Sequence, residues 1–346
     1  MRHNKKIIII LTIIFLTSIS QIKLIPSERN AQPEGLIGIP KGASLWPPEG
    51  PRRALGEPPE AYKSAKQDIQ TPFRFLSQDK LTAAGELFYL LSADDNEKYE
   101  KEIKELCNAV GFRLSVTHCG EERIYMIIEK EKDRRGRGFY LFRRGEALPV
   151  LLQAPHGGDD LFTDSITMKL FLENKVKAAA FNTVTRKVAD LAHMTGTCFQ
   201  QLTVAFARRY SQGTVFQLHG YVRSKRKTSE GASADFIISD GTKQPQPNLA
   251  KAVRCLSKKT KAVCRLFPRD VKELGATLNT QGQALRKINF QGFIHVEAAL
   301  NWRKKLKADA MLRKHIADCF LPPAALRGVA FVKAPQNFCL ALRAGG

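Results

Sequence analysis

Residues 148–163 read LPVLLQAPHGGDDLFT, an apolar run that leads directly into a histidine, two glycines and two aspartates. The run Leu148–Gln153 is typical of a buried strand. The glycines let the backbone bend, so that His156 and one of Asp159 or Asp160 can converge at the strand end. A histidine and a carboxylate at this spacing can hold one face of a divalent metal. The alternative is a turn in which the aspartates cap a following helix.

A second histidine leaves another apolar strand, in the sequence FQLHG at residues 216–220. A lone histidine at such a position is more often a structural hydrogen-bonding group. If this strand lies parallel to the first, His219 becomes a third metal ligand. Two histidines and one carboxylate leave a coordination position open for water, as a catalytic zinc site requires.

A third polar motif, HVE at residues 295–297, lies inside an apolar strand. Because side chains alternate along a strand, His295 and Glu297 share one face. A carboxylate that points from a strand into a metal cleft suits a general base. The alternative is a buried ion pair between Glu297 and Arg303 or Lys304.

The pattern from Leu148 onward alternates between strands and helices, which predicts an α/β fold with a mixed, largely parallel sheet flanked by helices. In such sheets, ligands bind at the carboxyl ends of the strands. The expected strands are 177–181, 214–218, 235–239, 262–267 and 293–298, and the expected helices are 198–210, 249–257 and 302–320.

Residues 71–145 predict a small α/β segment of unknown role, ahead of a catalytic domain at 146–346. A strand is expected at Glu86–Leu91, and a hairpin is expected from the runs Arg123–Ile128 and Gly138–Phe142. These strands form either a small domain or one edge of the main sheet.

The N-terminus has the order of a secretory signal, with basic residues, the apolar run Ile7–Leu16 and then small residues. We therefore expect a signal peptide or membrane anchor at 1–20, a proline-rich linker at 21–70, and a protein that is periplasmic, secreted or anchored on the outer side. The run is short for a membrane span.

Seven cysteines occur without CxxC spacing, which disfavours a thiolate zinc site or a redox motif. Cys255 and Cys264 are close enough in sequence to form a disulfide, or they are two buried free thiols. The formal net charge is +22, so the surface attracts anionic partners. No motif for specific nucleic-acid binding is present.

Two polar clusters suggest substrate contacts. Asn182 and Arg186 follow one predicted strand, and Asn279 and Arg286 lie in a predicted polar loop. Arginine binds carboxylates through two parallel hydrogen bonds. Asp190 and His193 are either further ligands or partners of the ligands.

Several of these motifs occur in an order that resembles the N-formylglutamate amidohydrolases and, more distantly, the zinc carboxypeptidases and poly-γ-glutamate hydrolases. They are PHGGDDLFT (155–163), NTVTR (182–186), ADLAH (189–193), VAFARRY (204–210), FQLHG (216–220), LGATLNTQGQALR (274–286) and HVEAALNWR (295–303). The resemblance covers about residues 148–320 and implies the phosphorylase/hydrolase-like fold of the zinc carboxypeptidases.

Carried over residue by residue, the resemblance makes His156, His219 and Asp159 or Asp160 ligands of Zn²⁺. It makes Glu297 the catalytic glutamate and Arg186 a contact for a substrate carboxylate. The carboxypeptidases use His-x-x-Glu, whereas this chain has an aspartate pair, so the third ligand is ambiguous.

The sequence thus predicts an exported hydrolase that cleaves an amide bond with metal-activated water. The expected substrate carries a carboxylate, as an acidic peptide, polyglutamate or a peptidoglycan peptide does. The alternative is a non-catalytic envelope module that binds anionic polymers through its basic surface, and stoichiometric metal separates the two.

Overall fold

The computed structural model describes residues 60–67, 72–119 and 121–322. The predicted signal peptide or anchor at 1–20 and most of the predicted linker lie outside these residues. Within them, none of the helices combines the length and the apolar character needed to cross a membrane.

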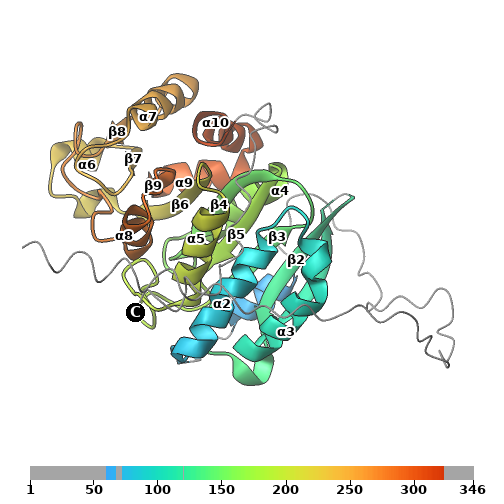
Figure 1. Ribbon diagram of the computed structural model, residues 1–346. Helices are drawn as coiled ribbons and strands as arrows, with labels where there is room; N and C mark the ends of the chain where they lie inside the picture. Colours follow the sequence, from blue (N-terminus) through green and yellow to red (C-terminus); the bar gives the residue numbers. More distant parts are fainter. Residues whose placement is uncertain (1–59, 68–71, 120, 323–346) are drawn as a thin grey trace, which may run out of the picture. The chain divides into compact units, whose positions relative to one another are not determined.

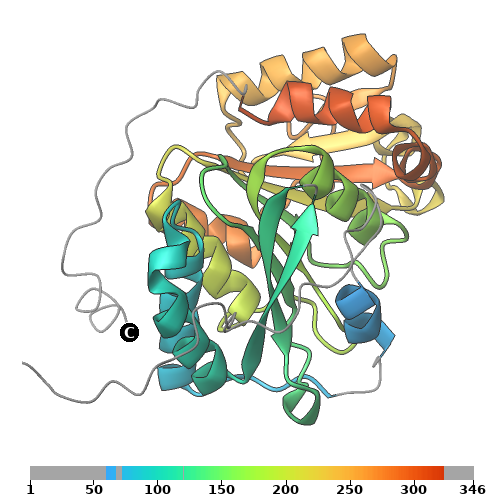
Figure 2. The ribbon, with the colours of Figure 1, turned by 90° about the vertical axis from the view of Figure 1, so that its right-hand side faces the viewer.

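The centre of the fold is a nine-stranded sheet that is covered by helices on both faces (Figures 1 and 2). In spatial order its strands are β1 (Phe112–Cys119), β2 (Glu122–Glu129), β3 (Phe139–Arg143), β5 (Val176–Phe181), β4 (Leu148–Ala154), β6 (Thr214–Tyr221), β9 (Phe293–Ala299), β7 (Phe236–Ser239) and β8 (Cys264–Leu266). The four central strands β5, β4, β6 and β9 are parallel, while β1–β3 and the β7–β9 pair are antiparallel. The predicted mixed α/β sheet flanked by helices is confirmed.

Two buried apolar clusters occupy the two faces of the sheet. One face is covered by α2 (Gln78–Leu91), α3 (Glu100–Val110), α5 (Cys198–Arg209) and α8 (Thr280–Lys287). The other face is covered by α1 (Glu60–Gln67), α4 (Thr163–Glu173), α7 (Pro247–Thr260), α9 (Leu300–Ala308) and α10 (Ala310–Phe320). The short helices α6 (Ser229–Ser233), η1 (Asn96–Tyr99), η2 (Glu131–Asp133) and η3 (Arg223–Lys225) lie in connections.

Strands β1–β3 continue the main sheet, since β3 pairs with β5. Of the two arrangements left open by the sequence, the structure therefore has the edge of the main sheet.

Two buried cations lie where this edge meets the central strands. Arg143 donates to the carbonyls of Val176, Phe171 and Asn174, and Lys177 donates to the carbonyl of Gly145.

Three predicted elements are wrong. Residues 86–91 are helical, because Leu81, Ala84, Leu87 and Phe88 recur at helical spacing and are buried together in α2. The predicted helix 302–320 is two helices, since Asp309 ends α9 and its side chain accepts hydrogen bonds from the first N–H groups of α10. The predicted polar loop around residues 278–286 begins α8, and Asn279 caps it.

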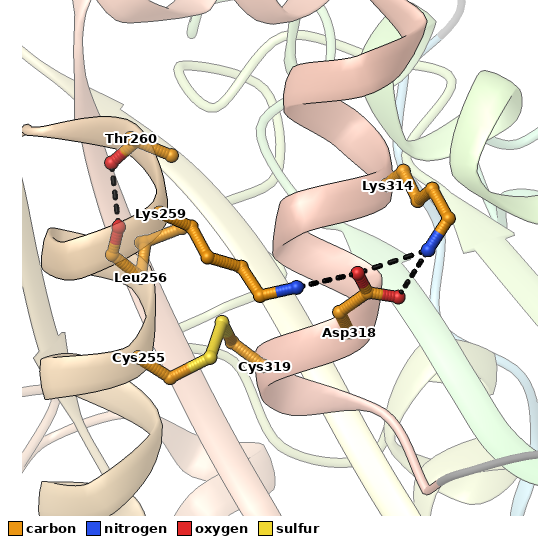
Figure 3. The surroundings of a disulfide bond; sticks show 7 residues. All are labelled: Cys255, Leu256, Lys259, Thr260, Lys314, Asp318 and Cys319. Atoms are coloured by element: carbon orange, nitrogen blue, oxygen red, sulfur yellow. Dashed lines mark hydrogen bonds and ion pairs between the residues drawn. A yellow bond between two sulfur atoms is a disulfide. The ribbon is translucent and has the colours of Figure 1, made fainter.

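A disulfide joins Cys255 in α7 to Cys319 in α10, and Figure 3 shows Lys259 and Asp318 paired beside it. The sequence allowed a Cys255–Cys264 disulfide or two free thiols, and both alternatives are wrong for Cys255, because α10 packs against α7 and brings Cys319 next to it. Cys264 in β8 is a free thiol, as are Cys107 and Cys198.

Candidate metal centre

The polar residues of the site lie at the carboxyl ends of three neighbouring parallel strands. His156 follows β4, His219 lies near the end of β6, and Glu297 lies beside His219 on β9. The same face of these strands carries Leu151, Val215 and Phe293 at the opposite end, so each strand changes from apolar to polar along its length. The parallel pairing predicted from the sequence is what gathers these side chains.

Three donor atoms from His156, Asp160 and His219 lie close together. The two Nδ1 atoms are 3.1 Å apart, and Asp160 Oδ2 lies 3.3 Å from His156 Nδ1 and 3.7 Å from His219 Nδ1. A triangle with these sides has a circumradius of about 2.0 Å, which equals the usual zinc–nitrogen and zinc–oxygen bond length. All three side chains are buried. The residues present therefore fit a divalent ion with two nitrogen ligands and one oxygen ligand.

His219, His295 and Glu297 form a second group of donors. The second group shares His219 with the first, and the other ring nitrogen of His219 is bound to Gln217. Both groups therefore share the side chain of His219, and they describe neighbouring parts of a single centre.

The positions of Asp159 and Asp160 show which of the two carboxylates belongs to the donor cluster. Asp160 accepts a hydrogen bond from the N–H of Gly220 at 3.0 Å, which aims the same oxygen, Oδ2, at both histidines. Asp159 is exposed and accepts from the N–H of Arg186 at 2.6 Å. Asp160 belongs to the donor cluster, and Asp159 does not.

Asp190 holds the far side of His156. Its Oδ1 lies 2.7 Å from His156 Nε2, and its Oδ2 accepts from Arg186 at 2.9 Å. A histidine that donates one ring N–H to a carboxylate presents its other nitrogen to a metal. The structure thus gives Asp190 the role of partner to a candidate ligand, one of the two roles left open by the sequence.

Burial and neighbouring charges shift the site's pKa values in opposite directions. Burial opposes a charged His156, but hydrogen bonds to Asp160 and Asp190 raise its pKa to about 9. Burial, together with the positive charges of neighbouring histidines, lowers the pKa of His219. Burial, aided by the negative charge of Asp160, raises the pKa of Glu297 to about 8.

Glu297 has the surroundings of a reactive carboxylate. Its Oε2 is buried and has no hydrogen-bond partner among the described residues, and the same holds for Nδ1 of the neighbouring His295. Arg303 does not compensate Glu297 by a hydrogen bond, because its guanidinium donates to the carbonyls of Ala298, Leu161 and Tyr221. Lys304 is exposed. In the described part of the chain, the ion pair that the sequence allowed with Arg303 or Lys304 does not form.

The centre opens into a cavity of about 450 Å³. Cations from two loops, Arg186, Lys225 and Arg226, form part of its wall, and Val222 and Leu278 add exposed apolar surface. The cavity also reaches His193 and Asn279.

The predicted substrate contacts divide into two groups. Arg186 and Asn279 line the cavity, whereas Asn182 and Arg286 do not. The amide of Asn182 is bound to backbone groups of Pro155, Ala189 and Val184. Sequence reasoning missed Gln217, Lys225 and Arg226, although Gln217 stands two residues before His219 and therefore shares its face.

The sequence matches no known family model and no curated protein. Among solved structures, an N-formylglutamate amidohydrolase from Ralstonia eutropha JMP134 is similar, with 14% identity and a TM-score of 0.40 over 51% of this chain and 93% of its own. A protein named as a candidate metallopeptidase from Shewanella amazonensis SB2B has 8% identity and a TM-score of 0.34 over 66% and 95%. A candidate carboxypeptidase from Burkholderia mallei has 10% identity and a TM-score of 0.34 over 59% and 64%.

These solved structures are named as amidohydrolase, metallopeptidase and carboxypeptidase, which are the kinds of protein that the sequence motifs of this chain resemble. The likeness is remote in both identity and TM-score, and the function proposed below therefore rests on the geometry of the donor cluster and on the chain's own motifs.

Proposed function

We propose that this protein is a metal-dependent amidohydrolase whose substrate carries a carboxylate. The observation that carries the proposal is the triangle of donor atoms from His156, Asp160 and His219, which lies in the same cavity as the carboxylate of Glu297. The choice of an amide bond rests on the resemblance of the motifs to N-formylglutamate amidohydrolases.

Zinc is the ion that suits two imidazoles and one carboxylate, and when bound it would act as a Lewis acid toward the scissile carbonyl and the attacking water. His156, Asp160 and His219 would hold it. Asp190 would keep the ring of His156 in position through the hydrogen bond at Nε2.

Glu297 would accept the proton of the attacking water and pass it to the leaving amine. Its burial and its position in the same cavity as the donor triangle support this role. The unpartnered Oε2 is the atom that would take the proton. Arg186, Lys225 and Arg226 would attract the carboxylate of the substrate.

The test is to incubate the zinc-supplemented protein with N-formylglutamate, N-acetylglutamate and γ-glutamyl peptides. Hydrolysis is measured as the amine that is released. We expect Glu297→Gln to retain fold and zinc content while turnover falls by roughly 100-fold or more. The matched control is Glu230→Gln, because Glu230 is exposed and lies outside the cavity wall. A Glu297→Gln variant with wild-type turnover would remove Glu297 from the reaction.

The +22 net charge favours a second candidate, a non-catalytic module that binds anionic envelope polymers. Such a module needs no metal. Polymer binding by a protein that takes up no stoichiometric zinc would favour it over the hydrolase.

We also propose that the protein is exported. The basic, apolar and small-residue order of the N-terminus supports this, and so does a disulfide between two helices, since disulfides persist in oxidising compartments. N-terminal sequencing of protein from its native host is expected to begin near Gln21. An intact Met1 in the soluble cytosol would contradict export.

A further inference from the structure

An amide group supports the face of His219 that points away from the cavity. His219 Nε2 lies 2.8 Å from Gln217 Oε1, and both side chains are buried. A neutral imidazole has one nitrogen that donates and one that accepts. The orientation of the Gln217 amide therefore decides which nitrogen of His219 carries the hydrogen.

The first anchor of that orientation is a backbone N–H. The N–H of Gly282 can only donate, and it donates to Asn279 Oδ1 at 2.9 Å. The amide nitrogen of Asn279 must then face Gln217, and it donates to Gln217 Oε1 at 2.6 Å. This assigns Oε1, an acceptor, to the side of Gln217 that faces Asn279 and His219.

A second anchor reaches Gln217 from the opposite direction. The carbonyl of Phe199 can only accept, so the hydroxyl of Thr203 donates to it at 2.9 Å. Thr203 Oγ1 therefore accepts from Gln153 Nε2 at 2.8 Å, and Gln153 Oε1 accepts from Gln217 Nε2 at 3.0 Å. Gln217 is again oriented with Oε1 toward His219.

A third anchor agrees with the first two. Gln281 Nε2 donates to the carbonyl of Leu191 at 2.7 Å, which leaves Gln281 Oε1 to accept from Gln217 Nε2 at 3.5 Å. Gln153, Gln217 and Gln281 are each fully buried, so water does not offer these amides an alternative partner.

We propose that this network, anchored on three backbone groups, holds His219 in the tautomer with hydrogen on Nε2 and a lone pair on Nδ1. Nδ1 is the atom 3.1 Å from His156 Nδ1 and 3.7 Å from Asp160 Oδ2. Gln217 is then a positioning residue, with Asn279 and Gln153 acting through it. The role of this tautomer in metal binding rests on the proposed function, because the lone pair on Nδ1 would be directed at the candidate ion.

The two histidines are oriented by different chemistry. His156 is supported by the carboxylate of Asp190, whereas His219 is supported by a neutral amide. A second carboxylate behind His219 would add negative charge to a fully buried region that already contains Glu297. The amide fixes the tautomer without that charge.

The direct test is the tautomer of His219 in metal-free protein, read from ¹⁵N–¹H correlations of the histidine side chains, with His219 assigned by a His219→Gln variant. We expect hydrogen on Nε2 alone in the wild type. Hydrogen on Nδ1, or an even mixture of tautomers, would overturn the proposal.

Two substitutions at Gln217 sharpen this test. Gln217→Met keeps the length and removes the acceptor, so we expect mixed tautomers at His219 and zinc affinity reduced by about 10- to 100-fold. Gln217→Glu keeps an acceptor toward His219 and Asn279 but loses the N–H groups that donate to Gln153 and Gln281. In the folded variant we expect hydrogen on Nε2 of His219 again. If the tautomers of folded Gln217→Met match those of the wild type, the proposal is wrong. If a variant does not fold, the wild-type spectrum still decides it.

Thr203→Val probes the redundancy of the anchors. It removes one of the three while Asn279 and Gln281 still hold Gln217, and the wild-type tautomer is expected. A changed tautomer in the folded variant would overturn the claim of three anchors. The spectrum does not depend on zinc, so a protein with the expected tautomer and no zinc affinity would refute the proposed function and leave this inference standing.

Discussion

At the scale of single residues, Asp159 and Asp160 are adjacent carboxylates with different surroundings. Asp160 Oδ2 points at both histidines from a buried position, and Asp159 is exposed. We predict that Asp160→Asn lowers zinc affinity by at least about 10-fold, because a ligand loses its charge. Asp159→Asn, its matched control, is expected to bind zinc as the wild type does. Titration with zinc against a competing chelator measures both, and equal affinities would contradict the assignment.

Lys177 gives a second prediction at this scale. Burial lowers its pKa to about 8, despite the nearby carboxylate of Asp94. Between pH 8 and pH 10.5 the unfolded chain binds this proton and the folded chain does not, so the free energy of unfolding rises with pH there. The shift corresponds to about 3 kcal/mol over that window.

Denaturant unfolding of wild type and Lys177→Met at pH 8 and pH 10.5 measures this difference. The wild type should gain stability relative to the variant as the pH rises. Lys175→Met is the control, because Lys175 is half-exposed. A constant difference between wild type and Lys177→Met across the window would show that the folded lysine has an ordinary pKa.

Residue types and strand parity were enough to predict which side chains meet at the centre. His156, His219 and Glu297 each leave or end an apolar strand, and parallel pairing brings them together. The choice between the two aspartates was not predictable, because it depends on the N–H of Gly220 from another strand. Lys225 and Arg226 could not be predicted as site residues either, because the conformation of the segment after β6 places them at the cavity.

At the scale of elements, helices caused most of the errors of prediction. The run ELFYLL at 86–91 contains aromatic and branched residues typical of strands, yet tertiary packing against α3 and α5 makes it helical. The break at Asp309 is readable in principle, because aspartate is a preferred cap. Apart from the run at 86–91, the predicted strands agree with the structure, because their apolar runs are short and bounded by polar turns.

The disulfide between α7 and α10 should contribute to stability. It closes a loop with a sequence separation of 64 residues, and removing a cross-link of that length costs about 4 kcal/mol. We predict a loss of that size in the Cys255→Ser, Cys319→Ser double variant, measured by denaturant unfolding.

Cys264→Ser is the matched control, because Cys264 is a free thiol in the neighbouring strand. The reductant dithiothreitol should destabilise the wild type and leave the double variant unchanged. Equal stability of wild type and double variant under oxidising conditions would mean that the bond does not form or does not stabilise the fold.

At the scale of the whole molecule, one continuous sheet positions the centre. Its antiparallel edge, β1–β3, contributes no residue to the cavity wall. The wall is built from β6, β9, the segments that follow β4, β5 and β6, and the loop before α8. The edge strands therefore contribute to the centre only by extending the sheet that positions it. The high positive charge of the chain would favour collection of an anionic substrate at that cavity.

The central claim is that His156, Asp160 and His219 bind one ion. Elemental analysis of the purified protein, after incubation with zinc and removal of the excess, tests it most directly. We predict one zinc per chain in the wild type and a near-complete loss of zinc in folded His219→Ala. A wild type without bound zinc, or a His219→Ala variant with unchanged zinc content, would contradict the claim.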